Sequence, residues 1–193
     1  MFYRVKVKDH VRVPPQDFGK PLEEGILEEL RKKYSGFIDK NLGIVISPLN
    51  IESVGEGVLI PGDGAAYHEA VFSMLVFKPE LQEVVPGFVT DITDFGAFIG
   101  LGPIDGMTHI SQTMPDFVSY SKDKVLQGKT TKRSLKVGDL VKAKIVAVSF
   151  KDPANPKIGL TMRQPFLGKE EWIAEDLANP KQAQAKQSKG KAK

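Results

Sequence analysis

Between residues 87 and 162 the sequence breaks into five short strand-like runs, each bounded by glycine or another turn residue. Runs of this kind predict short strands with one buried face. Five of them favour a small closed barrel of the OB type, because closure removes the exposed edges of a small sheet. A segment at 111–136 interrupts the series and is predicted to hold a helix around 116–126 and then a basic loop, GKTTKRSLK. The predicted strands span 87–93, 97–100, 106–109, 139–150 and 157–162.

The first 80 residues show a different pattern. Residues 2–13 alternate between charged and apolar types, which predicts a strand, and residues 21–34 place Leu22, Ile26, Leu30 and Tyr34 on one stripe, which predicts an amphipathic helix. A strand, a helix and three further strands make a small α+β domain with an RNP-like order. Its ten basic and twelve acidic residues do not suggest a surface for nucleic acid. The three further strands are predicted at 42–47, 51–60 and 66–77.

We therefore expect three parts: an α+β domain at 1–80, an OB-fold domain at 81–180, and a tail at 181–193. The OB domain is expected to end in a short helix from Gly168, with Trp172, Ile173 and Leu177 packing back. The tail holds five lysines and no acid, aromatic or β-branched residue. Such a segment cannot bury enough apolar surface to offset its ordering entropy, so we expect it to be disordered.

The composition excludes several classes of protein. The chain has no cysteine, which rules out disulfides, thiolate zinc sites and a cysteine nucleophile. Its start lacks the apolar run of a signal peptide, and no stretch approaches 18 consecutive apolar residues. We therefore expect a cytoplasmic protein with no membrane partner.

Charge is strongly segregated along the second domain. Residues 81–121 contain five acids and no lysine or arginine, whereas residues 122–163 contain eleven basic and three acidic residues, a local charge of +8. Such a block indicates either a solvated face or a surface that binds the phosphate backbone, and the pattern alone favours neither. The residues that could follow phosphates are those of the basic loop and of the last two strands: Lys129, Lys132, Arg133, Lys142, Lys144, Lys157 and Arg163.

Two phenylalanines, Phe95 and Phe98, lie three residues apart around Gly96. Residues i and i+3 of a strand face opposite ways, so the two rings can lie together only if the chain bends at the glycine. Outward rings near His109 would stack on unpaired bases. The alternative is that both rings belong to the barrel core, and the pattern by itself slightly favours that alternative.

A catalytic or metal site is not indicated. The three histidines, His10, His68 and His109, lie in separate segments, and none has a metal-ligand spacing or a nucleophile–base pattern. Asp91, Asp94 and Asp105 are best explained as turn and strand-end aspartates. We expect no catalytic residue, no metal and no cofactor.

Residues 82–165 resemble the RNA-binding OB-fold domain named after the largest protein of the small ribosomal subunit, the S1 domain. The similarity lies in PGFVTDITDFGAFIGLGPIDGMTHISQ and LKVGDLVKAKIVAVSF…PKIGLTMR. It implies that the two box aromatics, Phe95 and Phe98, form an RNA surface with His109 and Lys157. Where this family often ends its fourth strand in an acidic residue, this chain has Ser149, which implies a permissive RNA path.

The N-terminal domain extends the resemblance. MFYRVKVKDHVRVPPQDFG, the amphipathic helix and VGEGVLIPGDGAAYHEAVFSMLVFKP are similar to the E′ family of stalk proteins in archaeal RNA polymerase, the counterparts of the seventh polymerase subunit of eukaryotes. The family implies a heterodimer with a small helical partner, the F subunit, docking on the core polymerase subunits through a tip loop near 55–65, and binding of the emerging single-stranded RNA by the barrel. The expected docking residues are Gly55, Val58, Leu59, Ile60, Pro61, Gly62, Asp63 and Gly64.

On this reading the chain is a non-catalytic part of a nucleotidyltransferase complex that supports transcription initiation and elongation. The alternative is a free-standing RNA-binding adaptor of translation initiation or RNA degradation.

Overall fold

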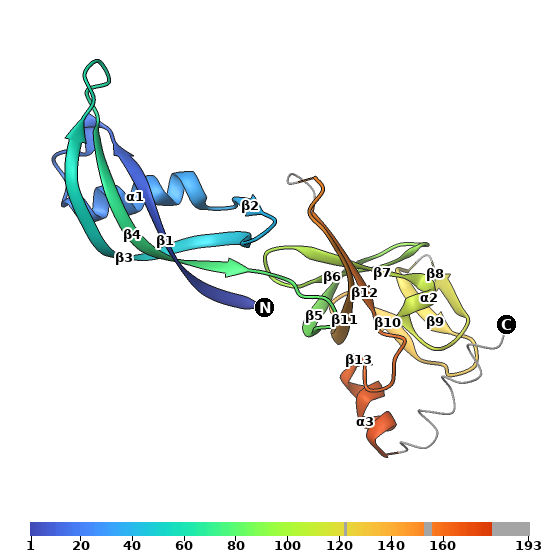
Figure 1. Cartoon of the computed structure of the whole chain (residues 1–193). Coiled ribbons are helices and arrows are strands. Elements are labelled where there is room, and N and C mark those ends of the chain that lie inside the picture. Colours follow the sequence, from blue (N-terminus) through green and yellow to red (C-terminus); the bar gives the residue numbers. More distant parts are fainter. Residues whose placement is uncertain (122, 153–155, 179–193) are drawn as a thin grey trace. The chain divides into compact units, whose positions relative to one another are not determined.

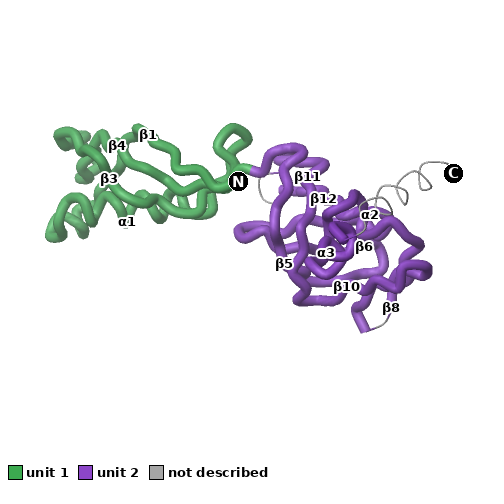
Figure 2. Tube along the Cα trace, turned by 90° about the horizontal axis from the view of Figure 1, so that it is seen from below, with its two compact units in different colours: residues 1–78 green, residues 79–193 purple. Residues whose placement is uncertain are grey.

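The computed structural model describes residues 1–121, 123–152 and 156–178. The chain divides into two compact units, Met1–Lys78 and Pro79–Lys193, which Figure 2 shows in separate colours. Among the described residues no helix is long and apolar enough to cross a membrane. The predicted disorder of residues 181–193 concerns a segment outside the described residues.

The first unit is a four-stranded antiparallel sheet with one long helix against it (Figure 1). The strands lie in the order β1-β4-β3-β2, so that the first and last strands of the unit are neighbours. A short 3-10 turn (Pro15–Asp17) separates the first strand from the helix. The other elements are β1 (Phe2–Val13), α1 (Leu22–Tyr34), β2 (Ile38–Asp39), β3 (Gly43–Leu59) and β4 (Ala66–Phe77).

The predicted helical stripe packs against the sheet. Ile26 and Leu30 of α1 are fully buried in one core with Phe72 and Met74 of β4. On β1 the alternate residues with lysine, arginine and histidine are exposed on the opposite face, where Lys8 pairs with Glu69 at 2.8 Å. The two faces of β1 therefore follow directly from the alternation in its sequence.

The two strands predicted at 42–47 and 51–60 are in fact one strand, β3, so that prediction was wrong. Pro48 does not interrupt it, because the pairing of this edge of β3 with β2 and the residues before β2 ends at Val45, and no other described strand pairs with it at Pro48. Proline is tolerated on an open edge, where its missing N–H costs no ladder hydrogen bond. Four register shifts against β4 absorb the extra residues of β3.

The second unit contains a five-stranded barrel, as predicted. The strands follow the order β12-β7-β6-β5-β11, and a further pairing of β12 with β11 closes the ring. Val89, Ile99, Ile145 and Leu160 fill its interior. The barrel strands are β5 (Val84–Ile92), β6 (Gly96–Gly100), β7 (Asp105–His109), β11 (Leu140–Ser149) and β12 (Lys157–Thr161).

The helix predicted around residues 116–126 is wrong. After a single helical turn, α2 (Ile110–Thr113), the chain forms a separate antiparallel sheet, which we call the inserted sheet. Leu126 is fully buried there and lies opposite Leu135, which is also fully buried. Burial that depends on the pairing of neighbouring strands cannot be predicted from the local periodicity of the sequence. The inserted sheet consists of β8 (Val118–Ser121), β9 (Val125–Gly128) and β10 (Ser134–Lys136).

The expected C-terminal helix is α3 (Glu170–Ala178), preceded by the short strand β13 (Gly168–Lys169). Trp172 is buried, as predicted. Leu177 does not pack back, because it is 65% exposed, and Asp176 is buried in the helix instead. The polar residue is buried because it has an ion-pair partner, described below.

Candidate nucleic-acid interface

Phe95 and Phe98 form an edge-to-face pair on the outside of the barrel. Their ring centroids are 6.0 Å apart and the ring planes are inclined by 89°. Phe95 is 46% exposed and Phe98 half-buried, so the alternative that both rings are core is wrong for Phe95. Phe95 lies in the turn before β6, where Thr93 and Gly96 exchange backbone hydrogen bonds. Because Phe95 is outside the strand, the parity rule does not keep the rings apart.

Gly96 is needed for close packing against the neighbouring strand. Its backbone lies against β7, and a Cβ atom placed on it would be 2.2 Å from the Thr108 carbonyl oxygen. No side chain fits at that distance, so the hairpin that carries both rings requires glycine at this position.

His109 lies beside this pair at the end of β7, opposite Gly96. The backbone N–H of Ser111 donates to its Nδ1 atom, and the Ser111 hydroxyl lies 2.9 Å from the same nitrogen. An accepting Nδ1 leaves the ring proton of the neutral imidazole on Nε2. The exposed ring therefore has a hydrogen-bond donor as well as a flat face.

The register shows two neighbours of Phe98 whose place beside the rings the sequence did not indicate. Met107 lies directly opposite Phe98 and extends the apolar strip on the outer surface. Asp91, on the other side of Phe98, forms an ion pair with Lys124 at 2.7 Å. The hydrogen bond from Lys124 lowers the pKa of Asp91, and the pair removes a negative charge that would repel phosphate beside the rings. Neither neighbour could be found without knowing how the strands pair.

The structure brings only some of the predicted basic residues near the aromatic pair. Lys157 is exposed on β12, two residues from Gly159, which lies opposite Met107. Arg163 follows β12 where Met162 N–H donates to Gln112 of α2, so it lies near the His109 end.

Lys142 and Lys144 point outward from β11 opposite Pro86 and Val84. Asp91, the partner of Phe98, lies five residues from Pro86, which is about 17 Å along β5. Along β5 the two lysines are therefore far from the rings, whereas through β12 Lys144 lies opposite Thr161, next to Leu160, which pairs with Thr108 beside His109. Lys129 and Lys132 are exposed in the loop between β9 and β10.

The prediction that Arg133 follows phosphates was wrong, because its side chain is not available to RNA. Its side chain is 8% exposed and its Nη2 atom lies 2.8 Å from Asp176 and 3.0 Å from Glu175. Its guanidinium also lies over the Trp172 ring, 5.5 Å from the centroid. This arginine of the basic loop thus holds α3 in place. A run of basic residues in the sequence does not show which side chain faces inward.

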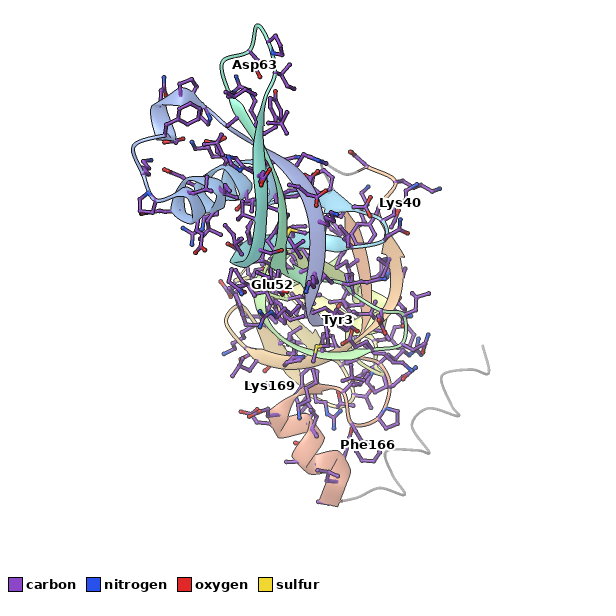
Figure 3. The ribbon with its side chains drawn as sticks, turned by 60° about the vertical axis from the view of Figure 1, so that its left-hand side comes forward. Tyr3, Lys40, Glu52, Asp63, Phe166 and Lys169 are labelled. Atoms are coloured by element: carbon purple, nitrogen blue, oxygen red, sulfur yellow. The ribbon has the colours of Figure 1, made fainter. Side chains whose placement is uncertain are left out.

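The second candidate surface is the loop between β3 and β4, the tip. Figure 1 shows it extending beyond the rest of its unit, and Figure 3 labels Asp63 at its end. Val58, Leu59 and Ile60 are consecutive exposed apolar residues, with Leu59 66% exposed. Gly62 and Gly64 have positive φ angles of 95° and 69°, so the turn requires them. Three exposed apolar side chains in succession make the tip a candidate site of protein contact.

The tip is held in place from below. Arg12 binds the Asp63 carboxylate with two hydrogen bonds of 2.6 and 3.0 Å, and the Tyr67 hydroxyl donates a third of 2.6 Å. These bonds lower the pKa of Asp63 to about 2. Beside the tip lies a hollow of about 380 Å³, lined on one side by Leu59 and Ala66 and on the other by Phe18 and Leu22. Tip and hollow together offer a projecting apolar group and a recess.

The geometry defines a two-part protein: an α+β unit with an apolar tip, followed by a barrel with exposed aromatic rings. Comparison with known families agrees with this division. Residues 8–64 match the family described as the SHS2 domain found in the N terminus of Rpb7p/Rpc25p/MJ0397, and residues 78–152 match the S1 RNA binding domain.

Relatives cover nearly the whole chain. DNA-directed RNA polymerase subunit Rpo7 of Saccharolobus solfataricus is 44% identical over 91% of this chain and 98% of its own length. Rpo7 of Sulfolobus acidocaldarius is 40% identical over 92% and 98%. DNA-directed RNA polymerase III subunit RPC8 of Saccharomyces cerevisiae is 36% identical over 59% and 54%. The chain belongs to the Rpo7 family of DNA-directed RNA polymerase subunits.

Proposed function

We propose that this chain is a non-catalytic stalk component of a cytoplasmic DNA-directed RNA polymerase, active in initiation and elongation. It pairs with a small helical partner, the F subunit of the polymerase, docks on the core enzyme through the tip, and binds the emerging single-stranded transcript on the barrel. The observation that carries the proposal is that one chain combines two separate exposed surfaces: an apolar tip suited to protein, and an aromatic pair suited to bases.

The barrel surface is suited to RNA by chemistry as well as by family. Phe95 and Phe98 present ring surface, His109 adds a donor, and Lys157 and Arg163 supply positive charge on neighbouring segments. Stacking is worth about 1–3 kcal/mol per base and tolerates any sequence, as a surface for a changing transcript requires.

The test of the RNA surface is a double substitution, Phe95→Ala with Phe98→Ala. We expect binding of a labelled single-stranded RNA, followed by fluorescence anisotropy, to weaken at least about tenfold while the barrel stays folded. Phe37→Ala removes an exposed ring from the N-terminal unit and is the matched control. Unchanged affinity in the double variant would contradict the assignment of the rings to RNA.

The test of docking is recovery of the polymerase. Val58→Ser with Leu59→Ser should reduce copurification of the large polymerase subunits, because each exposed apolar side chain contributes up to about 2 kcal/mol when buried in an interface. Leu177→Ser is the control, since Leu177 is equally exposed but lies on α3. Recovery of the native protein with ribosomes or exonucleases instead would favour the free-standing adaptor.

A further inference from the structure

The inserted sheet has two faces of different composition. Strand pairing places Leu126 and Leu135 on the inner face, where both are fully buried. The outer face consists of every second residue of the three strands, together with the residue before β8 and the residue after β9. These are Phe117, Ser119, Ser121, Val125, Gln127, Lys129, Ser134 and Lys136.

Phe117 is the least protected residue of this face. It is 81% exposed, more than any other large hydrophobic side chain among the described residues. The backbone N–H of Lys129 donates to the Phe117 carbonyl at 2.9 Å, so ring and ammonium group belong to the same row of the sheet. A phenylalanine so exposed cannot contribute to the core, and its ring is accessible to a ligand.

The backbone at Phe117 is held by the side chain of its neighbour, Asp116. The Asp116 carboxylate accepts hydrogen bonds from the backbone N–H groups of Thr130 and Thr131 and from the Thr131 hydroxyl. The Phe117 N–H donates to the other oxygen of the same carboxylate at 2.7 Å. Ring and basic loop are thus joined through one side chain, and a preorganised surface loses less entropy on binding.

The chemistry of the face favours a polyanion with flat bases over another protein. Its eight positions include two lysines, four hydroxyl or amide side chains and no acid. Asp116 lies below the face, engaged with the threonines. The centre of a protein interface needs contiguous apolar area, and here a single large ring stands among polar groups. Single-stranded nucleic acid needs what is present: a stacking ring, phosphate partners and neutral hydrogen-bonding groups.

We propose that the outer face of the inserted sheet is a second contact surface for single-stranded RNA, on which Phe117 stacks against a base and Lys129 and Lys136 neutralise phosphates. This proposal rests on the proposed RNA binding of the barrel and extends it to a separate sheet. The Phe117 surface does not include Phe95, Phe98 or His109.

The experiment measures RNA affinity of the full chain by fluorescence anisotropy with a labelled 20-nucleotide oligouridine. We expect Phe117→Ala to weaken binding about five- to tenfold. When it is combined with the Phe95→Ala, Phe98→Ala double variant, the changes in binding free energy should add. Leu177→Ala, at another highly exposed apolar residue of the same unit, is the control and should bind like wild type. Neutralising Lys129 and Lys136 to Gln should lower the slope of log affinity against log salt by about 1.4, about 0.7 per phosphate contact on a single strand.

Each outcome separates the two proposals. If the wild-type chain does not bind the RNA, the proposed function of the barrel fails. If it binds and only the Phe95, Phe98 double variant is impaired, the barrel site stands and the second surface is overturned. If Phe117→Ala binds RNA normally but recovers less polymerase, the face is a protein contact and the RNA proposal is again overturned. Crosslinks from 4-thiouridine RNA to the peptide around Phe117 would support it directly.

Discussion

Removing the Arg133 guanidinium should destabilise the second unit strongly. Arg133→Met leaves Asp176, whose side chain is 10% exposed, as a buried carboxylate whose remaining donor among the described residues is the Phe166 N–H, at 3.3 Å. Breaking a buried pair by removing one partner costs about 3–5 kcal/mol, and loss of the contact with Trp172 adds about 1 kcal/mol. The bond to Glu175 contributes little, because that carboxylate is largely exposed.

The assay is urea unfolding followed by the fluorescence of Trp172. The chain has one tryptophan, and it contacts Arg133, so its signal reports on the second unit alone. With a urea m-value of about 1–1.5 kcal/mol/M, a loss of about 4 kcal/mol moves the midpoint down by about 3–4 M. Lys132→Met, at the exposed neighbouring position, should change stability by less than about 0.5 kcal/mol.

A double-mutant cycle makes the reasoning refutable. Asp176→Asn keeps an acceptor for the Phe166 N–H but removes the charge, so in that background Arg133→Met should cost clearly less than in wild type. If the two substitutions are additive, or if Arg133→Met shifts the midpoint no more than Lys132→Met does, the buried ion pair does not hold α3. Arg133 would then be free to act in the basic loop as its sequence suggested.

Three further predictions follow from contacts described above. Gly96→Ala should lower the free energy of unfolding by about 1–3 kcal/mol, and with it the melting temperature, because the new methyl group meets the Thr108 carbonyl; an unchanged melting temperature would contradict that contact. Burial raises the pKa of Asp116, but hydrogen bonds from the threonine N–H groups outweigh it and lower the pKa to about 2. The pKa in the folded state is thus below the ordinary 3.8, so the ionised Asp116 stabilises the fold above about pH 4 and loses that effect towards pH 2. Asp116→Asn should therefore be less stable than wild type by about 1–2 kcal/mol at pH 6, and the two stabilities should converge near pH 2. Hydrogen bonds from Arg12 and Tyr67 likewise lower the pKa of Asp63 to about 2, so carboxyl NMR should give a midpoint near 2 that rises towards 3.8 in Arg12→Ala.

Regular local patterns were reliable where one element buries its own stripe. The stripe of Leu22, Ile26, Leu30 and Tyr34 predicted α1, and the alternation from Phe2 predicted β1. Short runs between turn residues located the five barrel strands to within three residues. These elements follow from the sequence because the period of burial is set by backbone geometry.

The sequence alone determined the two-unit organisation, the family resemblance, and the aromatic box and apolar tip as candidate surfaces. Tertiary structure decided what each residue is available to do. It turned Arg133 inward to pair with Asp176 across 43 positions of the chain. It also arranged β8, β9 and β10 as a separate antiparallel sheet. The physical reason is that the exposure and the charge pairing of a side chain depend on which distant segments of the chain come together. The residues next to it in sequence do not specify those contacts.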